Sequence, residues 1–297
     1  MPMTSDDSSI PDNDKLFIRT QSPADGQRDR MLSYVLANDG GAHGLTLFFC
    51  HGGGGNKNQW RRQWSHFAAQ GARLVAWDCL GHGCSAQPRR PNAYDGALTI
   101  GDYLEVVRRF GSRRNILVAH SYGCLLTLAV LLALREADEL NRIAGVLLLA
   151  PPSPLRPLAL GPMAYLPAFV LEWLRPRLTT AFRHLAWHPD TDPDLVAFEE
   201  RATRGNAMRT VKAVFSGAVR LDPASLGALS LPIDIAVGAE DRLTPPNQAQ
   251  DLAALLPGAR LHVVDQAAHQ VMLERPEAIN ALLETLLASA SVTAGGR

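Results

Sequence analysis

Short apolar runs alternate with helical patterns along most of this chain. An opening pair of apolar runs lies at residues 15–20 and 31–37, and six later runs are continuously apolar rather than alternating. Continuous apolar runs are typical of strands buried on both faces of a parallel sheet. These six runs lie at residues 45–50, 73–78, 115–120, 144–150, 233–238 and 260–265.

Helical periodicity fills the intervals between the later runs, at residues 59–70, 100–110, 122–137, 247–256 and 276–287. Strand–helix alternation of this kind indicates βαβ units, whose right-handed crossovers place helices on both faces of the sheet. The pattern therefore predicts an α/β fold with a mostly parallel, eight-stranded sheet flanked by helices.

The alternation is interrupted once, between residues 151 and 229, where prolines punctuate a stretch without a strand pattern. An interval of this length is too long for an ordinary loop, so we expect a helical cap over the carboxyl edge of the sheet. The predicted organisation is a disordered leader at 1–14, a hydrolase-type core at 15–150 and 230–288, the cap at 151–229 and a flexible tail at 289–297.

Charge and composition narrow the range of functions. Lys and Arg number 29, as do Asp and Glu, so the chain lacks the basic excess with which nucleic-acid-binding proteins neutralise phosphates. Residues 115–134 carry no Asp, Glu, Lys or Arg, but polar residues and a glycine near the start favour a strand, a turn and a buried helix over a membrane span. We expect no nucleic-acid partner and no span, and contact with a membrane surface is left open.

The four cysteines, at positions 50, 79, 84 and 124, form no C-x-x-C pair and no Cys/His cluster with zinc spacing. Residues 1–15 are acidic and polar and lack the basic and apolar segments of a secretion signal. We therefore expect a cytoplasmic protein without a metal site. Its oligomeric state is left open.

The apolar run at 115–120 leads directly into Ser121 and then into a helical pattern, with the sequence Ala-His-Ser-Tyr-Gly at 119–123. Small residues around a serine at a strand-to-helix junction allow the sharp turn that exposes a nucleophilic hydroxyl. We favour Ser121 as a nucleophile. The alternative is a serine that caps the amino end of the helix.

A glycine-rich segment, His51 followed by four glycines, comes directly after the run at 45–50. Glycines allow the backbone to approach a substrate closely and to present N–H groups to a developing oxyanion. The alternative is a phosphate-binding loop, but neither Walker spacing nor G-x-G-x-x-G accompanies it. We therefore interpret this segment as part of an oxyanion hole.

Five segments, each following an apolar run, make the chain similar to a known superfamily. They are HGGGG at 51–55 with Trp60 after it, DCLGHGCS at 78–85, AHSYG at 119–123, GAEDRLTPP at 238–246 and AAHQVMLERP at 267–276. In this order they resemble the capped serine hydrolases of the α/β-hydrolase superfamily, and the resemblance covers nearly the whole chain.

The resemblance implies a catalytic triad of Ser121, Asp241 and His269, in the chain order that this fold uses. Ser121 matches the nucleophile, His269 the general base, and Asp241 the carboxylate that orients the base. The backbone N–H groups of Gly53 and Tyr122 match the donors of the oxyanion hole.

Other residues near these motifs have competing interpretations. Glu240 and Asp265 are alternative partners for the histidine, because one precedes Asp241 and the other ends the last apolar run. His51 and His82 are expected to make structural hydrogen bonds, and His120 is expected to pack beside the serine turn.

The predicted function is hydrolysis of a carboxylic ester, a thioester or a lipid acyl group through an acyl-enzyme on Ser121. No cofactor is implied. The same triad also supports carbon–carbon bond hydrolysis, acyl transfer or perhydrolysis, and the fold alone does not separate these reactions. A third interpretation is a non-catalytic receptor or scaffold.

The substrate class is inferred from the cap. Residues 157–171 carry no acidic or basic side chain and are interrupted by prolines. Such a segment either packs on the core or lines an apolar pocket. We expect a lipophilic small-molecule acyl substrate, with Phe169 and Trp173 lining its pocket.

Overall fold

Strands that are far apart in sequence lie side by side in one sheet. The computed structural model describes residues 10, 16–20, 30–40, 44–156, 163 and 165–292. Within these residues, eight strands pair in the order β1-β2-β4-β3-β5-β6-β7-β8, and β2 is antiparallel to both of its neighbours while the other pairs are parallel. The predicted mostly parallel, eight-stranded sheet is therefore confirmed. The strands are β1 (Leu16–Thr20), β2 (Arg30–Ala37), β3 (Leu45–Cys50), β4 (Arg73–Trp77), β5 (Arg114–His120), β6 (Ile143–Leu149), β7 (Ile233–Gly238) and β8 (Arg260–Val264).

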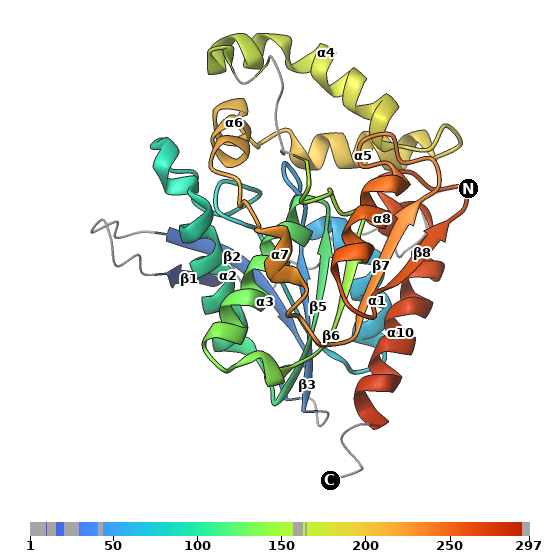
Figure 1. The fold of residues 1–297 in the computed structure, drawn as a ribbon. Coiled ribbons are helices and arrows are strands. Elements are labelled where there is room, and N and C mark those ends of the chain that lie inside the picture. The colour runs from blue at the N-terminus through green and yellow to red at the C-terminus, as the bar shows by residue number, and fades with distance from the viewer. Residues whose placement is uncertain are drawn as a thin grey trace.

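Helices cover both faces of this sheet (Figure 1). Alternate residues of a strand point to opposite faces, so Phe48 of β3 joins one apolar cluster while Leu47 and Phe49 join the other. The first cluster contains residues of α2, α3 and α8, and the second contains residues of α1 and α10. These helices are α1 (Arg61–Ala69), α2 (Gly96–Phe110), α3 (Tyr122–Glu136), α8 (Pro246–Leu255) and α10 (Pro276–Val292).

Two predicted helices differ from the structure at their amino ends. Helix α2 begins at Gly96 rather than at residue 100, because the Asp95 side chain accepts the N–H of Ala97 at 3.0 Å and caps the first turn. The predicted helix at 59–70 is divided into the short 3₁₀-helix η2 (Lys57–Trp60) and α1. Two further 3₁₀-helices are η3 (Pro91–Tyr94) and η4 (Leu140–Arg142), and a one-turn helix is α9 (Val271–Glu274).

The two ends of the chain differ in part from expectation. Ile10, within the predicted leader, is buried in the cluster beneath α1 and α10. Helix α10 continues through Val292, although a flexible tail was predicted from residue 289. Burial of Ala290 and a hydrogen bond of 2.9 Å from the Ser289 hydroxyl to the Thr285 carbonyl extend the helix. The remainder of the predicted leader and tail lies outside the described residues.

In its described residues, the predicted cap segment carries four helices between β6 and β7: α4 (Ala168–Ala186), α5 (Pro193–Thr203), α6 (Met208–Ser216) and α7 (Pro223–Leu226). Figure 1 shows α4, α5 and α6 above the carboxyl ends of the strands, with α4 outermost. A buried ion pair between Arg61 of α1 and Glu199 of α5 joins this segment to the core. No helix in the described residues is long and apolar enough to span a membrane.

The first turn of α3 crosses the end of β3 with no room for a side chain. A Cβ atom at Gly123 would lie 2.7 Å from the carbonyl oxygen of His51 and 2.9 Å from that of Cys50. Both neighbours are backbone atoms, which cannot rotate away. Glycine at 123 is therefore required for α3 to start where it does.

Gly123→Ala is expected to destabilise the protein, because inserting a methyl group into a close-packed contact costs about 1–3 kcal/mol. The matched control is Gly101→Ala in α2, where a Cβ would meet nothing within 4 Å. In that exposed helical position alanine should raise stability by up to about 1 kcal/mol. Thermal unfolding of both variants provides the measurement, and equal melting temperatures would contradict the packing argument.

Candidate active site

Ser121 lies in a strained turn between β5 and α3. Its backbone has φ 51° and ψ −123°, a conformation that residues with a side chain rarely adopt. Backbone hydrogen bonds hold it: the Ser121 N–H donates to Leu149 at 2.8 Å, and the Ser121 carbonyl accepts from Cys124 at 2.8 Å. The Ser121 side chain makes no capping bond to α3, which removes the alternative of a helix-capping serine.

Asp241 and His269 come together at the ends of β7 and β8. His269 Nδ1 lies 2.8 Å from Asp241 Oδ2, and both side chains are almost fully buried. A carboxylate beside Nδ1 places the proton on that nitrogen and leaves Nε2 as the basic one. This is the arrangement that a general-base histidine needs.

A short turn after β7 orients the Asp241 carboxylate. Asp241 Oδ1 accepts the backbone N–H groups of Leu243 at 2.9 Å and Thr244 at 2.8 Å. The Thr244 hydroxyl lies 2.8 Å from Asp241 Oδ2, 3.0 Å from His269 Nδ1 and 3.0 Å from the Ala150 carbonyl. Thr244 therefore links the acid, the histidine and the end of β6.

The ionisation of Asp241 follows from its partners. Burial disfavours the charged carboxylate, but the attraction of His269 and hydrogen bonds from His269 and Thr244 outweigh burial and lower the pKa of Asp241. The stabilisation due to this shift is present above the ordinary carboxyl pKa and is lost as pH falls through the lowered value. Asp241 is thus ionised at neutral pH.

The two alternative carboxylates are directed elsewhere. Glu240 accepts the backbone N–H of Ala267 at 3.2 Å. Asp265 lies at the end of β8 with its side chain exposed. Of the three candidates, the structure brings only Asp241 into hydrogen-bond contact with the His269 ring.

The glycine segment lies directly against the serine turn. A Cβ at Gly52 would lie 3.1 Å from Ser121 Cβ, and one at Gly53 would lie 3.5 Å from Tyr122 Cβ. The structure thus places Gly53 and Tyr122, the candidate oxyanion donors, beside each other. Their assignment as donors stays a prediction.

Two histidines support the glycine segment. His51 Nδ1 donates to the Gly52 carbonyl at 2.7 Å, and His51 Nε2 accepts the Cys79 N–H at 2.9 Å. His82 Nε2 accepts the Gly54 N–H at 3.0 Å while Nδ1 donates to the Leu80 carbonyl at 3.1 Å. Burial, together with the nearby His51, lowers the pKa of His82 to about 3, so this acceptor is retained at neutral pH.

His120 does more than pack beside the turn. Its Nε2–H donates to the His269 carbonyl at 2.9 Å, and the two rings lie 4.7 Å apart. Burial and the neighbouring His269 lower the pKa of His120 to about 3, which keeps it neutral. The sequence holds a signal for this role, because His120 ends β5 at the sheet edge where the loop after β8 arrives.

The histidine loop is also tied to the cap. The buried Glu274 carboxylate accepts the Ala268 N–H at 2.8 Å, the His188 N–H at 2.6 Å and the Thr191 hydroxyl at 2.7 Å. The His269 N–H donates to the Ala186 carbonyl at 3.1 Å, at the end of α4. No local motif around Glu274 indicated this role.

Phe169 and Trp173 do not occupy the expected positions. They are 75% and 72% exposed, whereas Leu171 is 1% exposed. Residues two positions apart lie on nearly opposite faces of a helix, so packing through Leu171 turns the two aromatic side chains outward. In this structure they line no enclosed pocket beside Ser121.

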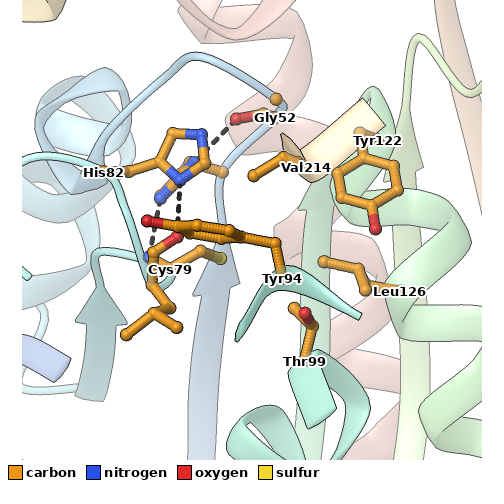
Figure 2. A pocket seen from close by; sticks show the side chains of 11 residues that line it. Gly52, Cys79, His82, Tyr94, Thr99, Tyr122, Leu126 and Val214 are labelled. Atoms are coloured by element: carbon orange, nitrogen blue, oxygen red, sulfur yellow. Dashed lines mark hydrogen bonds between the residues drawn. The ribbon is translucent and has the colours of Figure 1, made fainter. Parts of the chain in front are cut away.

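A small cavity instead lies beside the glycine segment (Figure 2). Its volume is about 10 Å³, roughly the space that one water molecule needs. Figure 2 shows Tyr94, Tyr122, Leu126 and Val214 around it, and Gly53 also lines it. Val214 belongs to α6, so the helical segment between β6 and β7 contributes to the wall of this cavity. Across the described residues no group of three or more His, Cys, Asp or Glu side chains is arranged to hold a metal ion.

Comparisons with known proteins agree with this architecture. Residues 47–282 match the sequence profile of the alpha/beta hydrolase family. A thermophilic esterase from Thermogutta terrifontis superposes with a TM-score of 0.76 at 20% identity, covering 94% of this chain and 99% of that structure. The likeness at this identity concerns the fold alone, and the predicted α/β-hydrolase fold is confirmed.

Two curated relatives are similar in sequence. Protein ABHD8 of Bos taurus is 29% identical over 245 residues, covering 82% of this chain and 56% of that protein. The 2-hydroxymuconate semialdehyde hydrolase of Pseudomonas putida is 28% identical over 236 residues, covering 75% of this chain and 79% of that enzyme. This chain spans about half the length of the first of these relatives.

The hydrogen bond between Asp241 and His269 predicts how Ser121 reacts. Asp241→Asn should slow labelling of Ser121 by a fluorophosphonate probe by roughly 10³-fold or more, because the imidazole loses its preferred tautomer. Glu240→Gln is the control and should label at nearly the wild-type rate. The measurement is the second-order labelling rate at neutral pH, and a reversed order of the two variants would mean that Glu240 is the acid.

Proposed function

The chain belongs to the alpha/beta hydrolase family, and from that premise we propose that it is a serine hydrolase that cleaves a carboxylic ester or thioester. The observation that carries this proposal is the buried contact of 2.8 Å between His269 Nδ1 and Asp241 Oδ2, at the sheet edge where the strained turn holds Ser121. A nucleophile, a base and an oriented acid are the three groups that acyl transfer to water requires.

In the proposed mechanism, His269 Nε2 removes the proton of the Ser121 hydroxyl as the oxygen attacks the substrate carbonyl. Asp241 holds the imidazole and stabilises the imidazolium that forms. The N–H groups of Gly53 and Tyr122 stabilise the oxyanion of the tetrahedral intermediate. His269 then gives its proton to the leaving alcohol or thiol, and water, deprotonated by the same histidine, releases the acid from Ser121.

The cavity beside Gly53 and Tyr122 supports an apolar acyl site. Its side-chain lining includes Leu80, Leu126 and Val214. A volume of about 10 Å³ holds about one water molecule, so an acyl group of any length requires the cap to shift or must lie toward α4. We propose a lipophilic small-molecule ester in which the acyl end enters this cavity.

A second candidate is hydrolysis of a carbon–carbon bond. It is favoured by the similarity to the 2-hydroxymuconate semialdehyde hydrolase of Pseudomonas putida, which is 28% identical over 75% of this chain. Acyl transfer and perhydrolysis use the same residues with a different acceptor and stay alternatives. Cytoplasmic placement and the small-molecule partner also stay predictions.

Ser121→Ala should remove turnover of acyl esters by about 10⁴–10⁶-fold, because the nucleophilic oxygen is lost. The folded variant should also fail to react with a fluorophosphonate probe. The measurement is kcat on a panel of nitrophenyl esters, with circular dichroism as the folding control. A wild-type protein that neither labels nor turns over esters would favour the receptor or scaffold interpretation.

Val214→Ala should shift the acyl-chain preference, because it enlarges the cavity at the oxyanion side. A methylene in such a pocket is worth roughly 1–3 kcal/mol, so kcat/KM for butyrate relative to acetate esters should rise about tenfold. Phe169→Ala is the matched control on the exposed face of α4, and its chain-length profile should run parallel to that of the wild type. If Phe169→Ala alters the profile and Val214→Ala does not, the acyl site lies under α4.

A further inference from the structure

Asn206, in the turn between α5 and α6, reaches from the cap into the core with its side chain. Its Nδ2 lies 2.6 Å from the Gly54 carbonyl and 3.1 Å from the Gly55 carbonyl, and its Oδ1 accepts the Gly83 N–H at 3.0 Å. The residue is 3% exposed. Both amide hydrogens and the amide oxygen therefore have partners, and all three partners are backbone atoms of glycines.

The glycine segment at residues 51–55 needs hydrogen bonds from other residues to hold a single conformation. Four consecutive glycines follow His51, and glycine has more backbone freedom to lose on folding than any other residue. Gly54 adopts φ 79°, and its N–H is fixed from the core by His82. Asn206, which lies in the cap, fixes the carbonyl oxygens of Gly54 and Gly55. The conformation of Gly53, the candidate oxyanion donor, depends on the peptide units that follow it.

Other contacts seat the cap without touching these glycines. Arg61 of α1 pairs with Glu199 of α5, and its guanidinium lies 4.6 Å from the Phe198 ring. Asn56 Nδ2 donates to the Ala202 carbonyl at 3.1 Å. Different side chains therefore attach the cap to the core and hold the glycine segment in place. Mutations can test these two roles separately.

We propose that Asn206 is a positioning residue through which the cap sets the geometry of the oxyanion hole. The inference rests on the proposed serine hydrolase function. The Asn206 carbonyl accepts from Arg175 of α4 at 2.8 Å, and Arg175 in turn pairs with Glu172. A shift of α4 therefore acts on the residue that holds the Gly54 and Gly55 carbonyls.

The test uses Asn206→Ala and the isosteric Asn206→Asp in the full chain. The aspartate variant still accepts the Gly83 N–H but has lost both donors to Gly54 and Gly55. Both variants should lower kcat on a soluble acetyl ester about 10- to 100-fold with KM within about threefold, because a misplaced oxyanion donor weakens the transition state more than substrate binding. Amide hydrogen exchange of the peptide covering residues 51–56 should become faster in both.

Glu199→Gln is the matched control. It removes a buried charge that joins the cap to the core, so it should lower the melting temperature while leaving kcat per folded molecule and exchange at residues 51–56 close to wild type. Failure of the wild type to turn over any ester, with no labelling of Ser121, would overturn the proposed function. The exchange measurement tests the anchoring of the glycine segment even in that case.

With an active wild type, three outcomes overturn the inference about Asn206 alone. The first is wild-type kcat in Asn206→Ala or Asn206→Asp. The second is an equal loss of kcat in Glu199→Gln, which would assign the effect to seating of the cap. The third is unfolding of both Asn206 variants, which would make Asn206 a requirement of the fold rather than of the oxyanion geometry.

Discussion

The backbone of Ser121 is the constraint around which the site is built. A residue with a side chain at φ 51° and ψ −123° is unfavourable by roughly 1–3 kcal/mol, and it persists only where its surroundings fix it. Hydrogen bonds to β6 and within the first turn of α3 do so here. The same turn requires Gly123, whose Cβ would collide with the end of β3. The strained backbone of Ser121 and the close contact at Gly123 therefore both arise from the same tight turn.

The helices between β6 and β7, the predicted cap, fall into two groups that contact the core in different ways. Helices α5 and α6 are joined to it by the Arg61–Glu199 pair, by Asn206 and by Val214 against the small cavity. Helix α4 lies outermost and carries exposed Phe169 and Trp173. Helices α5 and α6 thus share buried polar contacts with the core, whereas α4 contacts the core at its carboxyl end, where the Ala186 carbonyl accepts the His269 N–H.

Sequence reasoning located the three candidate residues at strand ends that coincide with short motifs, and their catalytic roles stay predictions. Ser121 and Asp241 follow the buried strands β5 and β7, His269 follows the edge strand β8, and parallel strands bring their carboxyl ends to one edge of the sheet. Asn206 and Glu274 were not predicted, because most of their partners belong to residues more than 80 positions away in sequence. The outward position of the Phe169 side chain was not predicted for a related reason. An apolar run shows that a helix has an apolar face, but only packing decides which face is turned inward.

The histidines around the site act as fixed hydrogen-bonding groups rather than as bases. His82 accepts a glycine N–H through a lone pair, and His120 donates to the His269 carbonyl while neutral.

Burial holds the pKa of His82 and of His120 at about 3, well below the value of about 6.5 for a free imidazole. The unfolded chain therefore binds protons in this range that the folded chain does not, so acidification below about pH 6.5 favours unfolding. The lowered pKa of Asp241 acts in the same direction at lower pH. Near neutral pH these supports keep their protonation states, which leaves the framework around Ser121 unchanged while His269 exchanges its proton in the proposed reaction.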